Sequence, residues 1–200
     1  MNALRPGQIL GDTYLVEELL GRGGMAEVYV VSHTRLPRRF ALKLLRLDRR
    51  PHAALVARFQ REAEILARLR HPHIVDVIDW NHTPSGEPYL VMELLYGEDL
   101  GRFLRRRGAQ PLAAALEITA QIGAALSAAH AVGVVHRDLK PSNIFLPTSG
   151  PVPRFVKVLD FGIARLLHSV NKPLTAAEEV LGTPGYMAPE QARGKTGEAD

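Results

Sequence analysis

A dense set of chemically capable side chains lies in residues 136–143, His-Arg-Asp-Leu-Lys-Pro-Ser-Asn. Asp138 and Lys140 are residue types that could flank a hydroxyl and a transferring phosphate, and Asn143 offers an amide oxygen to a metal ion. His136 also has a purely structural interpretation, as a core histidine whose ring nitrogens are hydrogen-bonded. The segment favours phosphate chemistry and leaves that structural alternative open.

A further acidic residue follows the expected strand Val156–Leu159. Asp160 stands at the end of this strand and is followed by Phe161 and Gly162. A carboxylate at a strand end beside a glycine is well placed to ligate Mg²⁺, a hard cation that prefers oxygen ligands. Taken alone, this motif is also compatible with a structural role.

A glycine-rich turn occupies Gly21–Gly24, where backbone N–H groups can approach phosphate oxygens closely. A dinucleotide-binding fingerprint would open a helix after such a turn, but the run Val28–Val31 predicts a strand. A bound phosphate is therefore expected under a β-hairpin. A tight hairpin without a ligand is the alternative interpretation.

Lys43 and Glu62 are candidates for an ion pair. In the expected strand Phe40–Leu45, Lys43 shares a face with Ala41, opposite the apolar residues. Glu62 lies on the apolar stripe of the expected helix Leu55–Arg70, where a carboxylate destabilises the fold unless it is paired. Lys43 is a suitable partner. The alternative is that Glu62 lies at the margin of the stripe, in water.

The elements that must position these residues fall into two groups. Alternating apolar residues predict strands around one helix before Gly97, and longer helical patterns follow it. The expected strands are Tyr14–Leu20, Glu27–His33, Phe40–Leu45, Ile74–Trp80, Tyr89–Leu94, Asn143–Leu146 and Val156–Leu159, and the expected helices are Leu55–Arg70, Leu100–Arg107 and Leu112–Ala131. A small antiparallel sheet lobe followed by a mainly helical lobe is an α+β architecture with a cleft between the lobes.

The composition excludes several classes of protein. The 200 residues are 46% hydrophobic and 23% charged, which is ordinary for a globular protein. The chain has no cysteine, so disulfide scaffolds, cysteine nucleophiles and cysteine-ligated metal sites are excluded. The net charge of +4 arises from short arginine clusters without interleaved aromatic residues. These clusters do not predict a nucleic-acid platform, whereas an acidic or phosphate-bearing partner stays open.

The order and spacing of the motifs resemble the signature set of protein kinases. Residues 23–29, Gly-Gly-Met-Ala-Glu-Val-Tyr, are similar to bacterial, eukaryotic-like serine/threonine kinases, and Lys140 and residues 182–186 resemble serine/threonine rather than tyrosine kinases. Ala26 departs from the pattern, since a third glycine often stands there. The matching residues, in chain order, are Gly21 and Gly23, Lys43, Glu62, His136-Arg137-Asp138, Asn143, Asp160-Phe161-Gly162 and Ala188-Pro189-Glu190.

The resemblance implies ATP-dependent phosphoryl transfer to serine and threonine hydroxyls of proteins, with ATP and Mg²⁺ as cofactors. Asp138 would orient and deprotonate the acceptor hydroxyl, and Lys140 would stabilise the γ-phosphate. Asn143 and Asp160 would hold Mg²⁺. Thr183 would brace Asp138 and Lys140.

The same resemblance implies a nucleotide site. Lys43, oriented by Glu62, would hold the α- and β-phosphates, and His136 would stack with Phe161 and Leu66 as an internal spine. The other implied contacts are Leu20, Gly21, Arg22, Gly23 and Gly24 in the turn, Val28, Ala41 and Phe145 around the adenine, Met92 as gatekeeper, and the backbone of Glu93 and Leu95 at the adenine edge.

Arg137 carries a regulatory implication, because in similar kinases such an arginine binds a phosphorylated residue of the activation loop. The hydroxyl residues between Asp160 and Thr183 are Ser169 and Thr175. Thr175 is favoured because it lies in a polar segment. In the rival interpretation, one of the glutamates that follow it partly substitutes for a phosphate.

The resemblance also divides the chain into an N-terminal extension (1–12), a small lobe (13–92), a hinge (93–97) and a large lobe (98–200). Similar kinases continue with further helices, so the expectation is a C-terminally truncated domain. These 200 residues alone would then be weakly active or inactive, because the helix Leu112–Ala131 loses its cover. That helix is expected to be a buried core helix and not a membrane span.

The expected partners are protein substrates with serine or threonine acceptors and a second copy of the chain for autophosphorylation. Nucleic acid and a membrane segment within the chain are not expected. No signal-peptide pattern is visible, and a cytoplasmic location is expected, with any membrane anchor outside these residues. Two other classes stay open: a nucleotide-binding pseudokinase, disfavoured by the presence of Lys43, Asp138, Asn143 and Asp160, and a basic interaction module.

Overall fold

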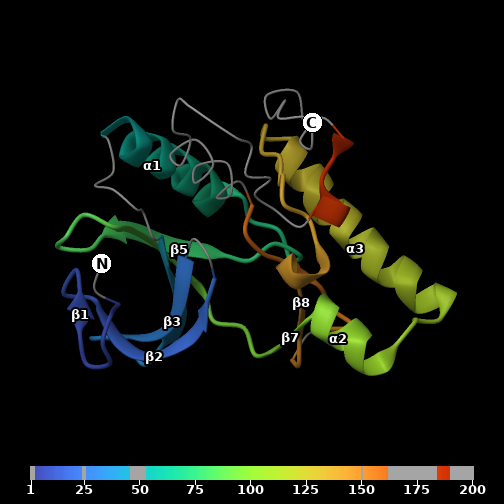
Figure 1. Ribbon diagram of the computed structural model, residues 1–200, viewed down its shortest axis with the longest axis horizontal. Coiled ribbons are helices and arrows are strands. Elements are labelled where there is room, and N and C mark those ends of the chain that lie inside the picture. The colour runs from blue at the N-terminus through green and yellow to red at the C-terminus, as the bar shows by residue number, and fades with distance from the viewer. Residues whose placement is uncertain (1–2, 24–25, 46–52, 150, 162–183, 190–200) are drawn as a thin grey trace. The chain divides into compact units, whose positions relative to one another are not determined.

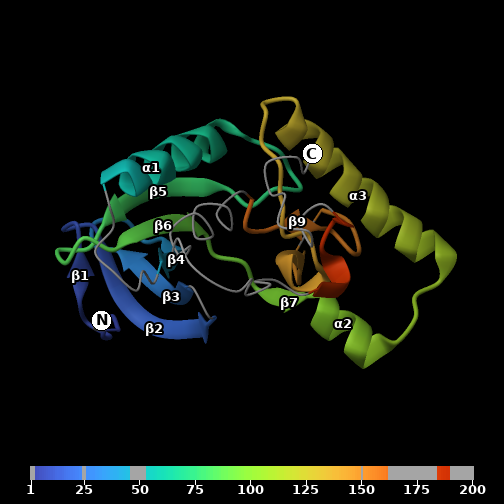
Figure 2. The ribbon, with the colours of Figure 1, turned by 45° about the horizontal axis from the view of Figure 1, so that its top comes forward.

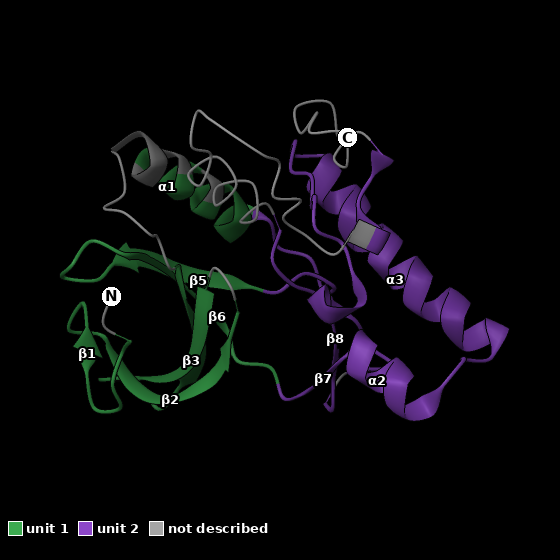
Figure 3. Cartoon of the chain, viewed as in Figure 1, with its two compact units in different colours: residues 1–68, 76–95 green, residues 69–75, 96–200 purple. Residues whose placement is uncertain are grey.

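A computed structural model describes residues 3–23, 26–45, 53–149, 151–161 and 184–189. The chain divides into two compact units (Figure 3). The first unit comprises Met1–Arg68 and Asp76–Leu95, and the second comprises Leu69–Val75 and Tyr96–Asp200. The segment Leu69–Val75 thus joins the second unit, although the sequence-based division places it in the small lobe.

The first unit is built on a six-stranded antiparallel sheet with the strand order β1-β2-β3-β4-β6-β5 (Figures 1 and 2). Its helix, α1 (Ala53–Arg68), packs along β5 through an edge-to-face contact between the rings of Phe59 and Trp80, 6.3 Å apart. The strands are β1 (Ile9–Leu10), β2 (Tyr14–Arg22), β3 (Ala26–His33), β4 (Arg39–Leu45), β5 (Val77–His82) and β6 (Pro88–Glu93). A sheet with one helix is the architecture that the sequence predicts for this half of the chain.

One face of the sheet forms the core of the unit. Phe40, Leu42 and Leu44 of β4 are buried in an apolar cluster with residues of β2, β3 and β6. Since side chains alternate along a strand, Ala41 and Lys43 point to the opposite face, and the predicted alternation is confirmed.

The N-terminal residues belong to this core and do not stand apart as an extension. Leu4 and Leu10 are 7% and 0% exposed and lie in the same apolar cluster. The backbone N–H of Gly7 donates to the carbonyl of Val16, and the N–H of Val16 donates to the carbonyl of Gln8, both at 2.8 Å. Sequence periodicity misses β1 because two residues are too few to show an alternation.

Within the described residues, the second unit contains a three-stranded sheet with the order β7-β8-β9 and two α-helices (Figures 1 and 2). Its elements are β7 (Gly97–Asp99), α2 (Leu100–Arg107), α3 (Leu112–His130), the 3-10 turns η1 (Pro141–Asn143) and η2 (Pro184–Tyr186), β8 (Ile144–Pro147) and β9 (Lys157–Val158). The sequence predicted no strand at β7. Gly97 permits it, since a Cβ there would lie 2.2 Å from the carbonyl oxygen of Leu146.

The apolar helix α3 is covered along one stripe only by the described residues. Ala114, Ile118, Ala125 and Ala129 are buried, whereas Leu112 is 75% exposed. An 18-residue window of α3 has a mean hydropathy of 1.4 and is 22% buried, so by length and composition the helix could cross a membrane. Most of the surface of α3 thus has no cover from the described residues, which agrees with the expectation that this helix loses its cover in these 200 residues alone.

Candidate active site

The segment after α3 brings two polar side chains to one carboxylate oxygen. Lys140 Nζ lies 2.9 Å from Oδ2 of Asp138. Asn143 donates from Nδ2 to the same oxygen at 3.1 Å and to the backbone carbonyl of Asp138 at 2.7 Å. The side chains of Asp138 and Lys140 are 30% and 23% exposed, so the group is half-buried but reachable from solvent. A charge-assisted network of this kind fixes the direction of the carboxylate.

The turn η1 positions Asn143. Pro141 has the fixed φ angle that suits the first residue of a helical turn, and the N–H of Asn143 donates to the carbonyl of Lys140 at 2.9 Å. Asn143 is only 7% exposed. Because its amide nitrogen is engaged with Asp138, the amide oxygen Oδ1 is the atom left to coordinate a cation.

Pairing of β8 with β9 brings Asp160 toward Asn143. Ile144 and Val158 are partners in this ladder, and the N–H of Leu159 donates to the carbonyl of Asn143 at 2.8 Å. Asp160 therefore follows directly after a residue bonded to Asn143. Its φ angle of 62° lies in the left-handed region, which aspartate tolerates better than most residues.

Mg²⁺ is usually held by one or two protein carboxylates together with waters and substrate phosphates. Asn143 and Asp160 supply an amide oxygen and a carboxylate of this kind. In the part of the chain that the structure describes, no group of three or more His, Cys, Asp or Glu side chains is arranged to hold a metal. The donor set thus fits a cation shared with a phosphate better than a site made by protein alone.

His136 links the two acidic residues through the core of the second unit. It is 2% exposed, its Nε2 donates to the carbonyl of Leu159 at 2.8 Å, and its Nδ1 accepts from the N–H of Asp138 at 3.3 Å. This arrangement requires the neutral imidazole. Burial lowers the pKa of His136, against the smaller raising effects of the Leu159 hydrogen bond and of the Asp160 and Asp138 carboxylates.

The satisfied core histidine considered from the sequence is therefore present, and it also contacts the site. The rings of His136 and Phe161 lie 4.7 Å apart between centroids with a 56° angle between their planes, so the two rings are in contact but tilted and not stacked. Leu66, the third residue of the expected spine, belongs to the other compact unit. Arg137, next to His136, is half-buried and has a φ angle of 64°. A left-handed backbone is uncommon for arginine, and such residues cluster at functional sites.

In the first unit, four of the expected nucleotide contacts share one face of the sheet. Cross-strand partners in an antiparallel sheet point to the same face, and the register pairs Val28 with Lys43 and Ala41 with Met92. Ala41 and Met92 are each 7% exposed. This face is opposite the apolar core and combines small apolar residues with one cation.

The glycine-rich turn is a hairpin between β2 and β3, so the predicted strand after it is confirmed. Gly21 and Arg22 lie in β2, and Gly23 closes the hairpin by donating its N–H to the carbonyl of Ala26 at 2.8 Å. Leu20 is 52% exposed at the same strand end. A backbone hydrogen bond therefore closes the turn, while the end of β2 that leads into it is exposed to solvent.

The remaining expected contacts are distributed over both units. Glu93 and Asp76 exchange two hydrogen bonds, at 2.8 and 3.0 Å, just before Leu95 ends the first unit. Phe145 lies in β8 of the second unit, where it pairs with Lys157. Outside the described residues fall Gly24, Ser169, Thr175, Thr183 and the side chain of Glu62, whose backbone lies in α1.

Sequence reasoning missed a buried acidic residue beside the turn. Glu27 is 3% exposed, and its Oε1 lies 2.9 Å from Nε of Arg22. The signal was available, because Glu27 stands in a strand on the same side as Tyr29 and Val31, which are buried. A charge at a buried strand position requires a partner, and the residue beside the turn provides it.

Comparisons with known proteins point to one family. The model of the protein kinase domain matches residues 14–199. The chain is 43% identical over 190 residues to the serine/threonine-protein kinase pkn3 of Myxococcus xanthus and 45% identical over 185 residues to Pkn1 of the same organism. These alignments cover 94% and 90% of this chain, but 35% and 26% of the relatives, so the chain spans about a third or less of their length.

Solved structures give the same fold. The PknI kinase domain of Mycobacterium tuberculosis superimposes with a TM-score of 0.73 at 32% sequence identity. The alignment covers 96% of this chain and 69% of that kinase domain. The expected α+β kinase fold, with a small antiparallel sheet, is thereby confirmed.

Proposed function

We propose, from the premise that this chain belongs to the protein kinase family, that it transfers the γ-phosphoryl group of ATP to serine and threonine hydroxyls of proteins. The relatives with the printed name serine/threonine-protein kinase support this acceptor class. The single observation that carries the proposal is the convergence of Lys140 and Asn143 on Oδ2 of Asp138. Phosphoryl transfer depends on positioning and charge stabilisation, and this cluster supplies both.

Asp138 acts as the group that orients the acceptor. Its Oδ2 is held by Lys140 and Asn143, which leaves Oδ1 to accept a hydrogen bond from a serine or threonine hydroxyl. As the oxygen of that hydroxyl forms a bond to the γ-phosphorus, the bond from this phosphorus to the β–γ bridging oxygen breaks and ADP leaves, while the hydroxyl proton passes to Oδ1. Lys140, beside the same carboxylate, offsets the negative charge of the transferring group.

Asn143 and Asp160 are the residues that would hold Mg²⁺ through Oδ1 and a carboxylate oxygen. When bound, Mg²⁺ neutralises charge on the phosphates. His136 keeps this geometry through two hydrogen bonds. One is to the carbonyl of Leu159, the residue before Asp160, and the other is from the N–H of Asp138. In the first unit, Lys43 and the glycine-rich turn hold the phosphates, and Val28, Ala41 and Met92 contact the adenine.

Activity is regulated through the segment between Asp160 and Thr183 in this proposal. Arg137 is the receptor for a phosphate on that segment, with Thr175 favoured over Ser169 as the acceptor. The left-handed backbone of Arg137 supports this role, because residues in such conformations cluster at functional sites. Autophosphorylation would make a second copy of the chain a partner.

The helix α3 is proposed to belong to the folded domain and not to a membrane. Polar side chains in its middle make tertiary contacts: Glu117 binds Arg154 at 2.6 Å, and Gln121 accepts from the N–H of Val156 at 2.9 Å. Such contacts are incompatible with a lipid-facing span. A cytoplasmic location is part of this proposal, because ATP is available there.

The proposal is tested with the protein at its full natural length, Mg²⁺, γ-³²P-labelled ATP and a generic acceptor protein. Label on phosphoserine or phosphothreonine after acid hydrolysis is the expected result. Binding of ATP without any transfer would assign the chain to the pseudokinases instead. Salt-sensitive binding of nucleic acid in place of ATP would favour a basic interaction module.

A further inference from the structure

A hydrogen-bonded chain of four residues connects the N-terminus to the glycine-rich turn. The backbone N–H of Leu4 donates to the hydroxyl oxygen of Tyr29 at 3.2 Å. The Tyr29 hydroxyl donates to Oε2 of Glu27, and Oε1 of Glu27 lies 2.9 Å from Nε of Arg22. Tyr29 and Glu27 are 2% and 3% exposed. The two middle residues of this hydrogen-bonded series therefore lie in the interior of the first unit, whereas the side chain of Arg22 is 54% exposed.

Because Glu27 is buried, its hydrogen bonds to Tyr29 and Arg22 matter for stability. A buried carboxylate destabilises the fold unless both of its oxygens are satisfied, and here one oxygen binds Tyr29 and the other binds Arg22. Burial, assisted by the adjacent Glu27 carboxylate, raises the pKa of Tyr29 to about 12, so its hydroxyl stays a donor. Loss of either partner would remove one of these contacts from a buried carboxylate, which costs more than the loss of the same contact at the surface.

Glu27 acts at the base of the glycine-rich turn. Arg22 and Glu27 are cross-strand partners at the last pair of β2 and β3 before the turn. Residues 18–22 of β2 are exposed, and the register of the two strands shifts between Val16 and Glu18 and between Leu19 and Gly21. This end of the hairpin thus has little apolar packing of its own. Among the described residues, the Arg22–Glu27 pair is a side-chain contact that joins the two strands at this end.

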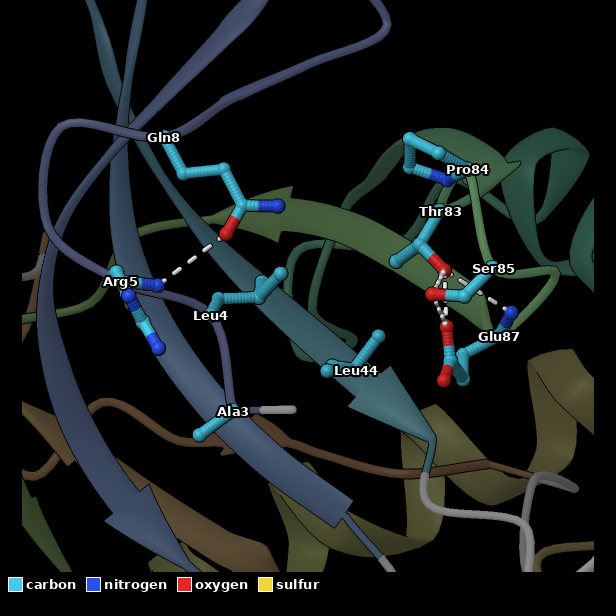
Figure 4. A pocket seen from close by; sticks show the side chains of 9 residues that line it. All are labelled: Ala3, Leu4, Arg5, Gln8, Leu44, Thr83, Pro84, Ser85 and Glu87. Carbon is cyan, nitrogen blue, oxygen red and sulfur yellow. Dashed lines mark hydrogen bonds between the residues drawn. The ribbon is translucent and has the colours of Figure 1, made fainter. Parts of the chain in front are cut away.

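The other end of this hydrogen-bonded series lies in residues 3–8, which contact the sheet on one side. Residues 3–8 are bonded to β2 through the backbone of Gly7 and Gln8. Figure 4 shows Ala3, Leu4 and Arg5 on one side of a cavity and Thr83, Ser85 and Glu87 on the other, with Leu44 on the sheet below. Residues 3–5 border this cavity, so the segment has room to shift. A shift would change the hydrogen bond from Leu4 to Tyr29.

We propose that Glu27 is a positioning residue for the glycine-rich turn and that residues 3–8 set its position through Tyr29. This inference rests on the proposed function in one respect, since the turn must bind the phosphates of ATP. Its consequence is that the N-terminal segment tunes ATP affinity without contacting the nucleotide. The transfer step at Asp138 is not affected.

The test compares two tyrosine variants. Tyr29→Phe removes the link between Leu4 and Glu27. Tyr14→Phe removes a similar hydrogen bond, 2.9 Å long, to Oδ2 of Asp79 in the same sheet, and Tyr14 is the first residue of β2, at the end of that strand away from the turn. We expect Tyr29→Phe to raise the KM for ATP about 3- to 10-fold and to leave kcat within about twofold, as fits the loss of one hydrogen bond to a charged group. Tyr14→Phe is expected to leave the KM for ATP unchanged.

Hydrogen–deuterium exchange without nucleotide provides a readout that does not depend on ATP binding. Faster exchange of residues 20–28 in Tyr29→Phe, but not in Tyr14→Phe, is expected. Deletion of residues 1–5 should give the same acceleration and should add nothing in the Tyr29→Phe background. Unchanged exchange in Tyr29→Phe, or a deletion effect that adds fully to it, would overturn the inference. Failure of the wild-type protein to bind ATP, with the exchange results intact, would overturn the proposed function alone.

Discussion

Asn143 donates two hydrogen bonds to Asp138, one to the backbone carbonyl at 2.7 Å and one to the carboxylate at 3.1 Å. The residue proposed to hold Mg²⁺ is therefore the one that orients the residue proposed to receive the hydroxyl proton. The metal site and the acceptor site share a side chain, so neither can move independently of the other.

Asn143→Ala should lower kcat/KM at least about 10²-fold, because it removes a cation ligand and a hydrogen bond to a carboxylate. Raising Mg²⁺ should restore part of the nucleotide binding but not kcat, since Asp138 stays unoriented. The exposed neighbour Ser142→Ala is the control and should behave as wild type. Full recovery of kcat at high Mg²⁺ would show that Asn143 does not orient Asp138.

Lys140→Met should lower kcat about 10- to 10³-fold with little change in the KM for ATP, because Lys140 acts on charge that develops during transfer. Steady-state kinetics at saturating ATP measures this. Lys157→Met is a matched control, since it removes a half-buried lysine of the same unit whose Nζ binds the carbonyl of Ile74 at 3.0 Å. An equal loss of kcat in both variants would show that Lys140→Met acts through general destabilisation of the fold and not through the transfer step.

Thr175→Ala should prevent activation by phosphorylation, whereas Ser169→Ala should not. Each variant is dephosphorylated, incubated again with ATP and assayed for transfer to an added acceptor. We expect about 10-fold or greater loss for Thr175→Ala, because the phosphate that pairs with Arg137 is missing. Full activity of Thr175→Ala after this cycle would exclude Thr175 as the regulatory site.

His136 should make the protein less stable in acid. Its pKa is lowered by burial in the folded state, so below about pH 6.5 the unfolded chain binds more protons and stability falls as the pH falls. His136→Gln should flatten the decrease in Tm between about pH 6.5 and 5. A residual slope should persist from His71, whose pKa burial also lowers. An unchanged slope in His136→Gln would contradict the neutral, buried state.

Local patterns in the sequence predicted the elements that carry the site. Alternation placed Lys43 and Ala41 opposite the core, and the polar segment after α3 was recognised by its residue types. Elements of two or three residues, β1 and β7, were missed because their formation depends on a neighbouring strand and not on their own sequence. Gly97 shows this, since the close approach to Leu146 that it permits is visible only in the fold.

Side-chain networks were the harder part to predict. Types and spacing suggested roles for Asp138, Lys140 and Asn143, but not that one carboxylate oxygen receives both partners. Glu27 was passed over because the sequence alone does not reveal that Arg22 and Tyr29 meet at its two oxygens. Such contacts depend on strand register, which a single sequence specifies weakly at an irregular hairpin.

The most direct test of the central claim is the single-turnover rate of phosphoryl transfer in Asp138→Asn, measured together with the Kd for Mg²⁺–ATP. The substitution keeps the size of the side chain and one acceptor oxygen for Lys140 and Asn143, but it replaces the oxygen that takes the proton with an NH2 group. We expect a rate lower by about 10²- to 10⁴-fold and a Kd within about threefold of wild type. A transfer rate equal to that of the wild-type protein would contradict this claim.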